Sequence, residues 1–115
     1  YKAGATITAG QPLYYDTATA TVKLCDTNDA TKLPCIGISL NGASSGQPVA
    51  AVSQDDAFTP GATLTVGQTY CVGTTAGTIV PISDLTTGDY PQILFVATTS
   101  SVAKLNIIAG TAAKP

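Results

Sequence analysis

The sequence contains no glutamate, arginine, histidine, methionine or tryptophan. Without histidine, neither a Ser-His-Asp triad nor a Cys-His pair can be assembled. Without arginine, no side chain can form a bidentate clamp on a phosphate or carboxylate. We therefore expect a protein that is not an enzyme and that uses no cofactor.

Charge is also scarce, since only 10% of the residues are charged and the net charge is −2. Long polar helices need Glu, Lys, Arg and Gln on their solvent face, whereas the 19 threonines suit a pleated sheet. The composition thus predicts an all-β chain. The five lysines are scattered, and no apolar run approaches the ~20 residues of a membrane helix, so we expect neither nucleic acid nor membrane as a partner.

One stretch occurs twice, because GATITAGQ at 4–11 returns as GATLTVGQ at 61–68. The register of 57 positions continues to about residue 41, and removing one residue in the 42–46 turn extends it. This predicts two copies of one unit, 4–53 and 61–109, within a single domain of residues 1–115. Residues 110–115 are expected to form a flexible tail.

Each copy has the pattern of short β-strands. Ile7 lies between two threonines, and Gly10 then permits a sharp reversal of the chain. Apolar residues alternate with polar ones over 18–25. Eight to ten such strands in two related halves predict two tandem β-meander units, which form a small β-barrel or a compact sandwich.

The sequence offers few groups for metal or acid-base chemistry. Cys25, Cys35 and Cys71 show no CxxC spacing, which favours buried free thiols, with a Cys25–Cys35 bridge as the alternative. The acidic stretch 26–29 could hold Ca²⁺ but lacks the glycine and distal glutamate of an EF-hand loop. The adjacent acids at 55–56 would point to opposite faces of a strand. We interpret both acidic stretches as solvated and expect no metal site.

Two apolar features have more than one interpretation. Where the first copy has Gly37 and Ser39 outward, the second has Leu94 and Val96, so this strand is apolar on both faces. It is either covered by the chain itself or meets another subunit. The tyrosines at 14, 15 and 70 suit half-buried packing, an interface anchor or a sugar-stacking platform.

The order of these motifs resembles the capsid decoration, or cement, proteins of tailed bacteriophages, a family with a two-part β-barrel. The resemblance covers nearly the whole chain, and the strand at 37–39 reads GIS where the family usually has GxA or GIA. The motifs that carry it are AG at 3–4, GQ at 10–11, LY at 13–14, IGISL at 36–40, GQPV at 46–49, LTVGQTYCV at 64–72 and AGTI at 76–79.

This resemblance implies a structural protein that is assembled in the host cytoplasm and binds the outer surface of an icosahedral head. Its partners would be the major capsid protein and itself, as a homotrimer at three-fold or quasi-three-fold sites. The residues expected to make subunit or capsid contacts are Tyr1, Lys2, Ala3, Leu94, Val96, Lys114 and Pro115. The alternatives are a carbohydrate-binding or adhesive β-module of a surface or secreted protein, and a piece of a pilus or tail tube.

Overall fold

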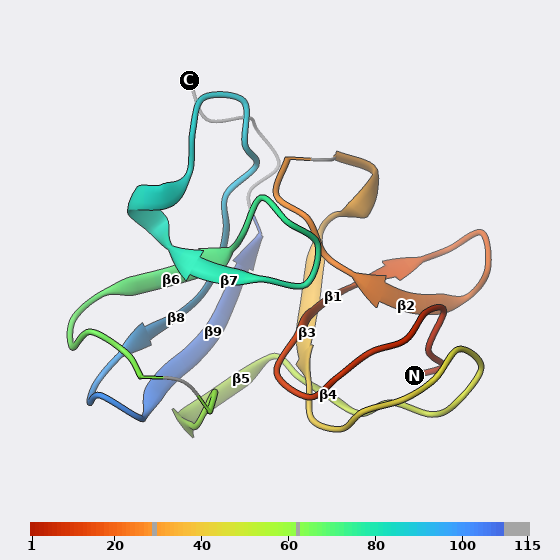
Figure 1. The fold of residues 1–115 in the computed structure, drawn as a ribbon, viewed down its shortest axis with the longest axis horizontal. Helices are drawn as coiled ribbons and strands as arrows, with labels where there is room; N and C mark the ends of the chain where they lie inside the picture. Colours follow the sequence, from red (N-terminus) through yellow and green to blue (C-terminus); the bar gives the residue numbers. More distant parts are fainter. Residues whose placement is uncertain (29, 62, 110–115) are drawn as a thin grey trace.

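The computed structural model describes residues 1–28, 30–61 and 63–109. These residues form nine β-strands and two short 3-10 turns, with no α-helix among them (Figure 1). The all-β prediction is confirmed. In chain order the elements are β1 Pro12–Asp16, β2 Thr21–Leu24, η1 Ala30–Lys32, β3 Cys35–Ser39, β4 Ala51–Val52, β5 Gln54–Phe58, β6 Thr69–Val72, β7 Ile79–Pro81, η2 Ile82–Asp84, β8 Gln92–Ala97 and β9 Ala103–Ala109.

The strands form two antiparallel sheets. The first has the order β2-β1-β3-β4 and the second the order β5-β9-β8-β6-β7. The two outer strands of each sheet do not pair with each other, so the predicted barrel does not close, and the arrangement is consistent with a sandwich (Figure 1). In the first sheet β3 pairs with β1 and not with β2, because the chain crosses over between β2 and β3. The units therefore differ from simple meanders by one crossover.

The two sheets share one strand order. The strand order of the first sheet, β2-β1-β3-β4, corresponds to the order β7-β6-β8-β9 in the second sheet, which has β5 as an additional strand beyond β9. Leu13 faces Leu24 in the first sheet, and Tyr70 faces Pro81 at the positions 57 residues later in the second. The pairing with the third strand shifts directly after Leu13 and directly after Tyr70. A duplicated unit predicts this agreement.

The fourth strands depart from the sequence alignment. The third and fourth strands are connected by residues 40–50 in the first sheet but only by 98–102 in the second. Ala51 and Ala103 consequently take equivalent places in the ladders, opposite the ends of β3 and β8. Removing a single residue from the alignment does not reproduce this register, since the length of the connection fixes which residues pair.

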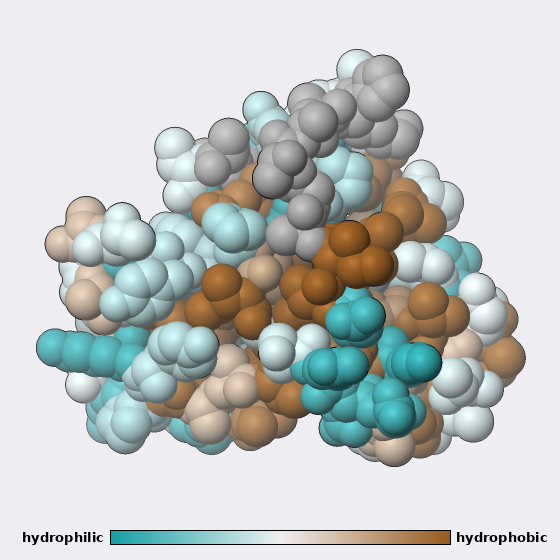
Figure 2. All heavy atoms as spheres, turned by 180° about the vertical axis from the view of Figure 1, so that it is seen from behind, coloured by the Kyte–Doolittle hydropathy of each residue, from teal (hydrophilic) through white to brown (hydrophobic). Residues whose placement is uncertain are grey.

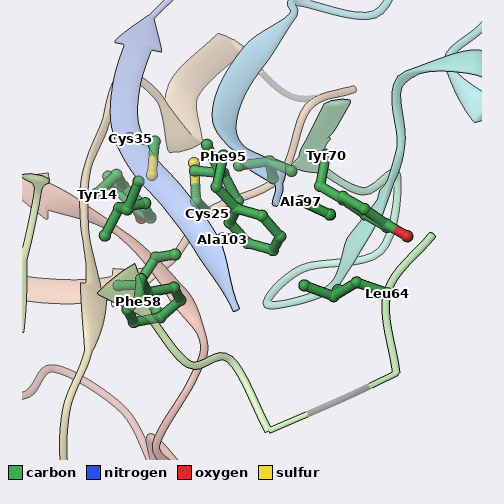
Figure 3. Close-up of a cluster of buried hydrophobic side chains, with 13 residues drawn as sticks. Tyr14, Cys25, Cys35, Phe58, Leu64, Tyr70, Phe95, Ala97 and Ala103 are labelled. Atoms are coloured by element: carbon green, nitrogen blue, oxygen red, sulfur yellow. The ribbon is translucent and has the colours of Figure 1, made fainter. Parts of the chain in front are cut away.

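The larger hydrophobic core is built from both sheets. Tyr14 and Ile38 of the first sheet join Phe58, Tyr70 and Phe95 of the second in one cluster of buried side chains (Figure 3). The Phe95 ring stacks on Tyr70 at a centroid distance of 5.2 Å and meets Phe58 at 5.9 Å. Each such ring contributes roughly 1.5–3 kcal/mol through burial, so this cluster joins the two halves into one folded body.

A second core lies within the first half, where the amino-terminal residues are bound in place. The Tyr1 ammonium donates to the Val49 carbonyl at 2.9 Å, and Val49 N–H donates back to the Tyr1 carbonyl at 2.8 Å. Val22 N–H donates to the Lys2 carbonyl at 2.9 Å. Ala3 is 1% exposed and packs in this core. Residues 1–3 are therefore an integral part of the folded first half.

Buried polar groups connect the two halves. The Thr27 hydroxyl donates to the Tyr90 carbonyl at 2.6 Å, and Tyr90 N–H donates to the Thr27 carbonyl at 2.7 Å. Cys35 N–H donates to the side-chain carbonyl of Gln92 at 3.0 Å. Both Thr27 and Gln92 are 0% exposed, so these hydrogen bonds satisfy polar groups that water cannot reach.

The three cysteines are free and buried, as predicted. The Cys25 thiol donates to the Lys32 carbonyl at 3.2 Å. A hydrogen bond with Cys35, together with burial, raises the pKa of the Cys25 thiol. Burial likewise raises the pKa of the Cys71 thiol to about 11. Because the thiolate is the reactive form, Cys25 and Cys71 are protected both by burial and by protonation, whereas a hydrogen bond with Cys25 lowers the pKa of the Cys35 thiol, which burial alone protects.

We expect a thiol-specific reagent to label none of the three cysteines in the folded protein at mildly alkaline pH and all of them in guanidinium chloride. The Cys71 thiol stays protonated longer in the folded state, so the free energy of unfolding should decrease as the pH rises from 9.0 towards about 11. Reagent absorbance and denaturant titrations measure the two effects. Rapid labelling of the native chain would contradict the buried positions.

Candidate subunit-contact surface

The amino-terminal residues expected to make contacts divide into two groups. Tyr1 and Lys2 are exposed beside the first sheet, with 61% of Tyr1 accessible. Ala3 is not available to a partner, because it fills the core of its own half and its N–H donates to Gln47. The prediction for Ala3 is wrong. Lys114 and Pro115 lie outside the described residues.

The sequence predicts that Leu94 and Val96 point to the same face of their strand. In the structure they do not. Leu94 is 0% exposed and belongs to the larger core, whereas Val96 is 39% exposed. The pairing of β8 with β9 shifts between Ile93 and Phe95, and this irregularity breaks the two-residue alternation. The prediction that Leu94 lies on an outer face is therefore wrong, while Val96 remains a candidate.

Val96 borders a shallow hollow on the outer face of the second sheet, which we name the β8–β9 hollow. Its volume is about 210 Å³, and Ile108, 58% exposed, is its most accessible apolar side chain. Ile93 and Ile108 lie opposite each other across the two strands. The side chains that line the hollow are Ile93, Phe95, Val96, Lys104, Asn106 and Ile108.

The rim of the β8–β9 hollow is polar. Lys104 is the direct strand partner of Val96, and Asn106 pairs with Gln54 on the edge strand β5. All three of these polar residues are exposed. Hydrophobic atoms also gather across the middle of the face seen in Figure 2, between hydrophilic regions. An apolar floor within a polar rim is the usual anatomy of a protein–protein contact.

Sequence reasoning did not single out Ile108. It directly follows Ile107, and two consecutive apolar residues in a strand point to opposite faces, so one of them is exposed unless both faces are covered. Leu105 is 0% exposed and Ile107 packs against the larger core, which leaves Ile108 on the other face. The two consecutive isoleucines are the sequence feature that could have indicated an exposed apolar side chain here.

The acidic residues stabilise local structure. The Asp26 carboxylate accepts from Asn28 N–H at 3.2 Å, and that of Asp55 accepts from Ala57 N–H at 3.0 Å. Asp26 is only 9% exposed, so its interpretation as solvated is wrong, whereas Asp55 is exposed. Within the described ranges, no three histidine, cysteine, aspartate or glutamate side chains lie close enough to hold a metal ion together.

The tyrosines do not form the sugar-stacking platform considered from the sequence. Tyr14 and Tyr70 are 8% and 9% exposed and belong to the larger core. Tyr15 instead faces outward and meets Tyr1, with ring centroids 6.4 Å apart and planes inclined by 56°. The accessible aromatic pair is therefore Tyr1 and Tyr15.

The fold and this surface define a class, namely a small two-sheet β protein whose two halves share a strand order and which carries an apolar hollow on one sheet. No helix among the described residues is long and apolar enough to cross a membrane. No protein-family model matches the chain, and no curated protein or solved structure matches it either.

Proposed function

We propose that this chain decorates the outer surface of an icosahedral phage capsid, where it binds the major capsid protein and stabilises the shell. The proposal rests on the motif order that resembles the cement proteins of tailed phages. It is also supported by the architecture, in which two sheets sharing a continuous core form one stiff body. Such a body can transmit load between neighbouring subunits without any chemical step.

The observation that carries the proposal is the β8–β9 hollow. Val96 and Ile108 expose apolar surface on two inner strands of the second sheet, β8 and β9, each of which pairs with a neighbouring strand on both sides. A rigid apolar patch loses little conformational entropy on binding, so its burial contributes efficiently to affinity. We propose that this hollow meets a capsid subunit or a neighbouring copy of the chain within a homotrimer.

The test is co-sedimentation of the purified chain with undecorated heads of the phage that encodes it. We expect Val96→Asp and Ile108→Asp each to weaken binding about ten-fold or more, because a carboxylate would be buried in an apolar contact. Leu40→Asp is the matched control, since Leu40 is 55% exposed directly after β3 in the first sheet and does not line the hollow. Light scattering with and without heads measures the oligomeric state.

Binding of both hollow variants at the wild-type affinity would remove the hollow from the contact. Failure of the wild-type chain to bind any undecorated head would remove the capsid proposal itself. Circular dichroism of the variants distinguishes a lost contact from a lost fold, since both substituted side chains are surface-exposed.

One observation favours a second function, binding of carbohydrate by an adhesive module. The pair Tyr1 and Tyr15, 61% and 39% exposed, provides accessible aromatic surface against which a sugar can pack. Glycan-array binding that disappears in Tyr15→Ala would support this function. Unchanged binding in that variant, or none in the wild type, would leave the capsid proposal as the one to pursue.

A further inference from the structure

In the first sheet, the edge of β2 is covered by the chain's own residues 2–4. Val22 N–H donates to the Lys2 carbonyl at 2.9 Å, and Gly4 N–H donates to the Val22 carbonyl at 2.9 Å. Ala3 between them is the parallel strand neighbour of Val22. These three residues therefore act as a short added strand on an edge that would otherwise be open.

At the corresponding edge of the second sheet the first half reaches Gly77, whose N–H donates to the Cys25 carbonyl at 2.9 Å, but the described residues provide no such cover at Ile79. Ile79 on β7, the edge strand, stands 57 positions after Val22 (Figure 1). Gly73 N–H donates to the Thr78 carbonyl, so in the antiparallel ladder the next pair, Val72 with Ile79, exchanges no hydrogen bonds. The N–H and C=O of Ile79 point away from β6, and among the described residues Ile79 has a strand neighbour on one side only.

The space beside Ile79 is also open where its counterpart is filled. In the first half Ala3, Ile7 and Val22 are at most 1% exposed and close the core. In the second half a pocket of about 270 Å³ takes this place. Pro60, Leu64, Tyr70 and Ile79 line it and stand 57 positions after Ala3, Ile7, Leu13 and Val22, and the lining also includes Gly10, Thr63, Gly77 and Phe95.

The chain cannot fill this pocket with the residues that precede it. In the first half, residues 1–3 are held between β2 and the long connection, through Gln47 and Val49. In the second half the connection is only 98–102, which provides no counterpart of those two residues. The residues up to Phe58 are committed to β5 at the far edge of the sheet.

We propose that the edge of β7 at Ile79, with the pocket beside it, is a docking slot for an extended peptide segment of a partner protein. The segment runs parallel to β7, exchanges two main-chain hydrogen bonds with Ile79 and carries a small apolar residue followed by glycine. The chain's own Lys2-Ala3-Gly4 is the template for this chemistry. This is strand addition to a free edge, with one side-chain pocket for selectivity.

A second copy of this chain is not the occupant, because its residues 1–4 are bound in its own first sheet. The glycine is required for a steric reason. A Cβ atom on Gly4 would collide with the side chains of Thr21 and Lys23, and the equivalent positions beside the slot carry Thr78 and Val80. The pocket of the slot shares Phe95 with the β8–β9 hollow, but the strand edge at Ile79 does not belong to the hollow, and the inference does not depend on the proposed function.

The test is a titration of the isotope-labelled full chain, followed by NMR, with an acetylated synthetic peptide of the sequence Tyr-Lys-Ala-Gly-Ala. We expect saturable shifts centred on the Ile79 amide. Thr63→Trp should weaken binding about ten-fold or more by filling the pocket, since Thr63 is an exposed residue on its lining. Thr65→Trp, two residues further on and also exposed, should leave the affinity unchanged.

A control peptide with valine in place of glycine should not bind. Equal binding of the two peptides, or equal affinity of the Thr63→Trp and wild-type chains, would overturn the proposal. Shifts centred on Val22 would also overturn it, because they would mean that the peptide displaces the chain's own residues 2–4 in the first sheet.

Discussion

Replacing Phe95 by alanine is expected to lower the free energy of unfolding by about 3–5 kcal/mol. Phe95 is 2% exposed, and its ring is the centre of an aromatic group, stacked on Tyr70 and tilted against Phe58. The substitution removes both ring contacts and leaves a cavity at the place where the two halves share their core. Guanidinium chloride titration followed by circular dichroism measures the loss.

Val66→Ala is the matched control for this experiment, since Val66 is 64% exposed and its truncation creates no cavity. We expect it to change the free energy of unfolding by less than about 0.5 kcal/mol. A loss of under about 1 kcal/mol for Phe95→Ala would contradict a shared core and would indicate that each sheet is stabilised separately.

Replacing Gln92 by leucine is expected to cost about 2–3 kcal/mol of unfolding free energy, although the side chains are similar in size. The Gln92 side-chain carbonyl accepts from Cys35 N–H, and its amide donates to the Pro91 carbonyl at 3.0 Å. Leucine would leave the buried Cys35 N–H without an acceptor. Denaturant titration gives the change in free energy.

Loss of a hydrogen bond between the halves should also be visible by hydrogen exchange, as faster exchange of the Cys35 amide. Gln54→Leu is the control, because Gln54 is an exposed residue on the edge strand β5. If the two leucine variants have equal stability, the hydrogen bond from Cys35 contributes nothing measurable to the contact between the halves.

The sequence predicted the features that depend on local pattern and composition. The scarcity of charge and the threonine content led to an all-β fold, and the absence of CxxC spacing led to buried free thiols. The 57-residue register placed equivalent strands at Leu13 and Tyr70. These inferences need only neighbouring residues or a comparison of two stretches, both of which a single sequence contains.

Features that depend on distant contacts were not predictable in this way. The shift beside Leu94 turns that side chain into the core, and simple alternation cannot anticipate an irregular pairing with β9. The binding of residues 1–3 requires the connection at 40–50 to fold back over them. Of Leu94 and Val96, both of which the sequence predicts to be exposed, only Val96 is exposed. Ile108, which lines the same hollow, could be identified only from the position of β9 beside β8.

The position of β9 sets the order in which the fold can be completed during synthesis. β5 is made in the middle of the chain, yet its strand partner is β9, the last described strand to leave the ribosome. The first sheet ends at Val52 and can assemble while the rest is being translated. The Gln54–Phe58 segment must wait as an unpaired edge, and its exposed Asp55 and Asp56 repel a second nascent chain during that interval.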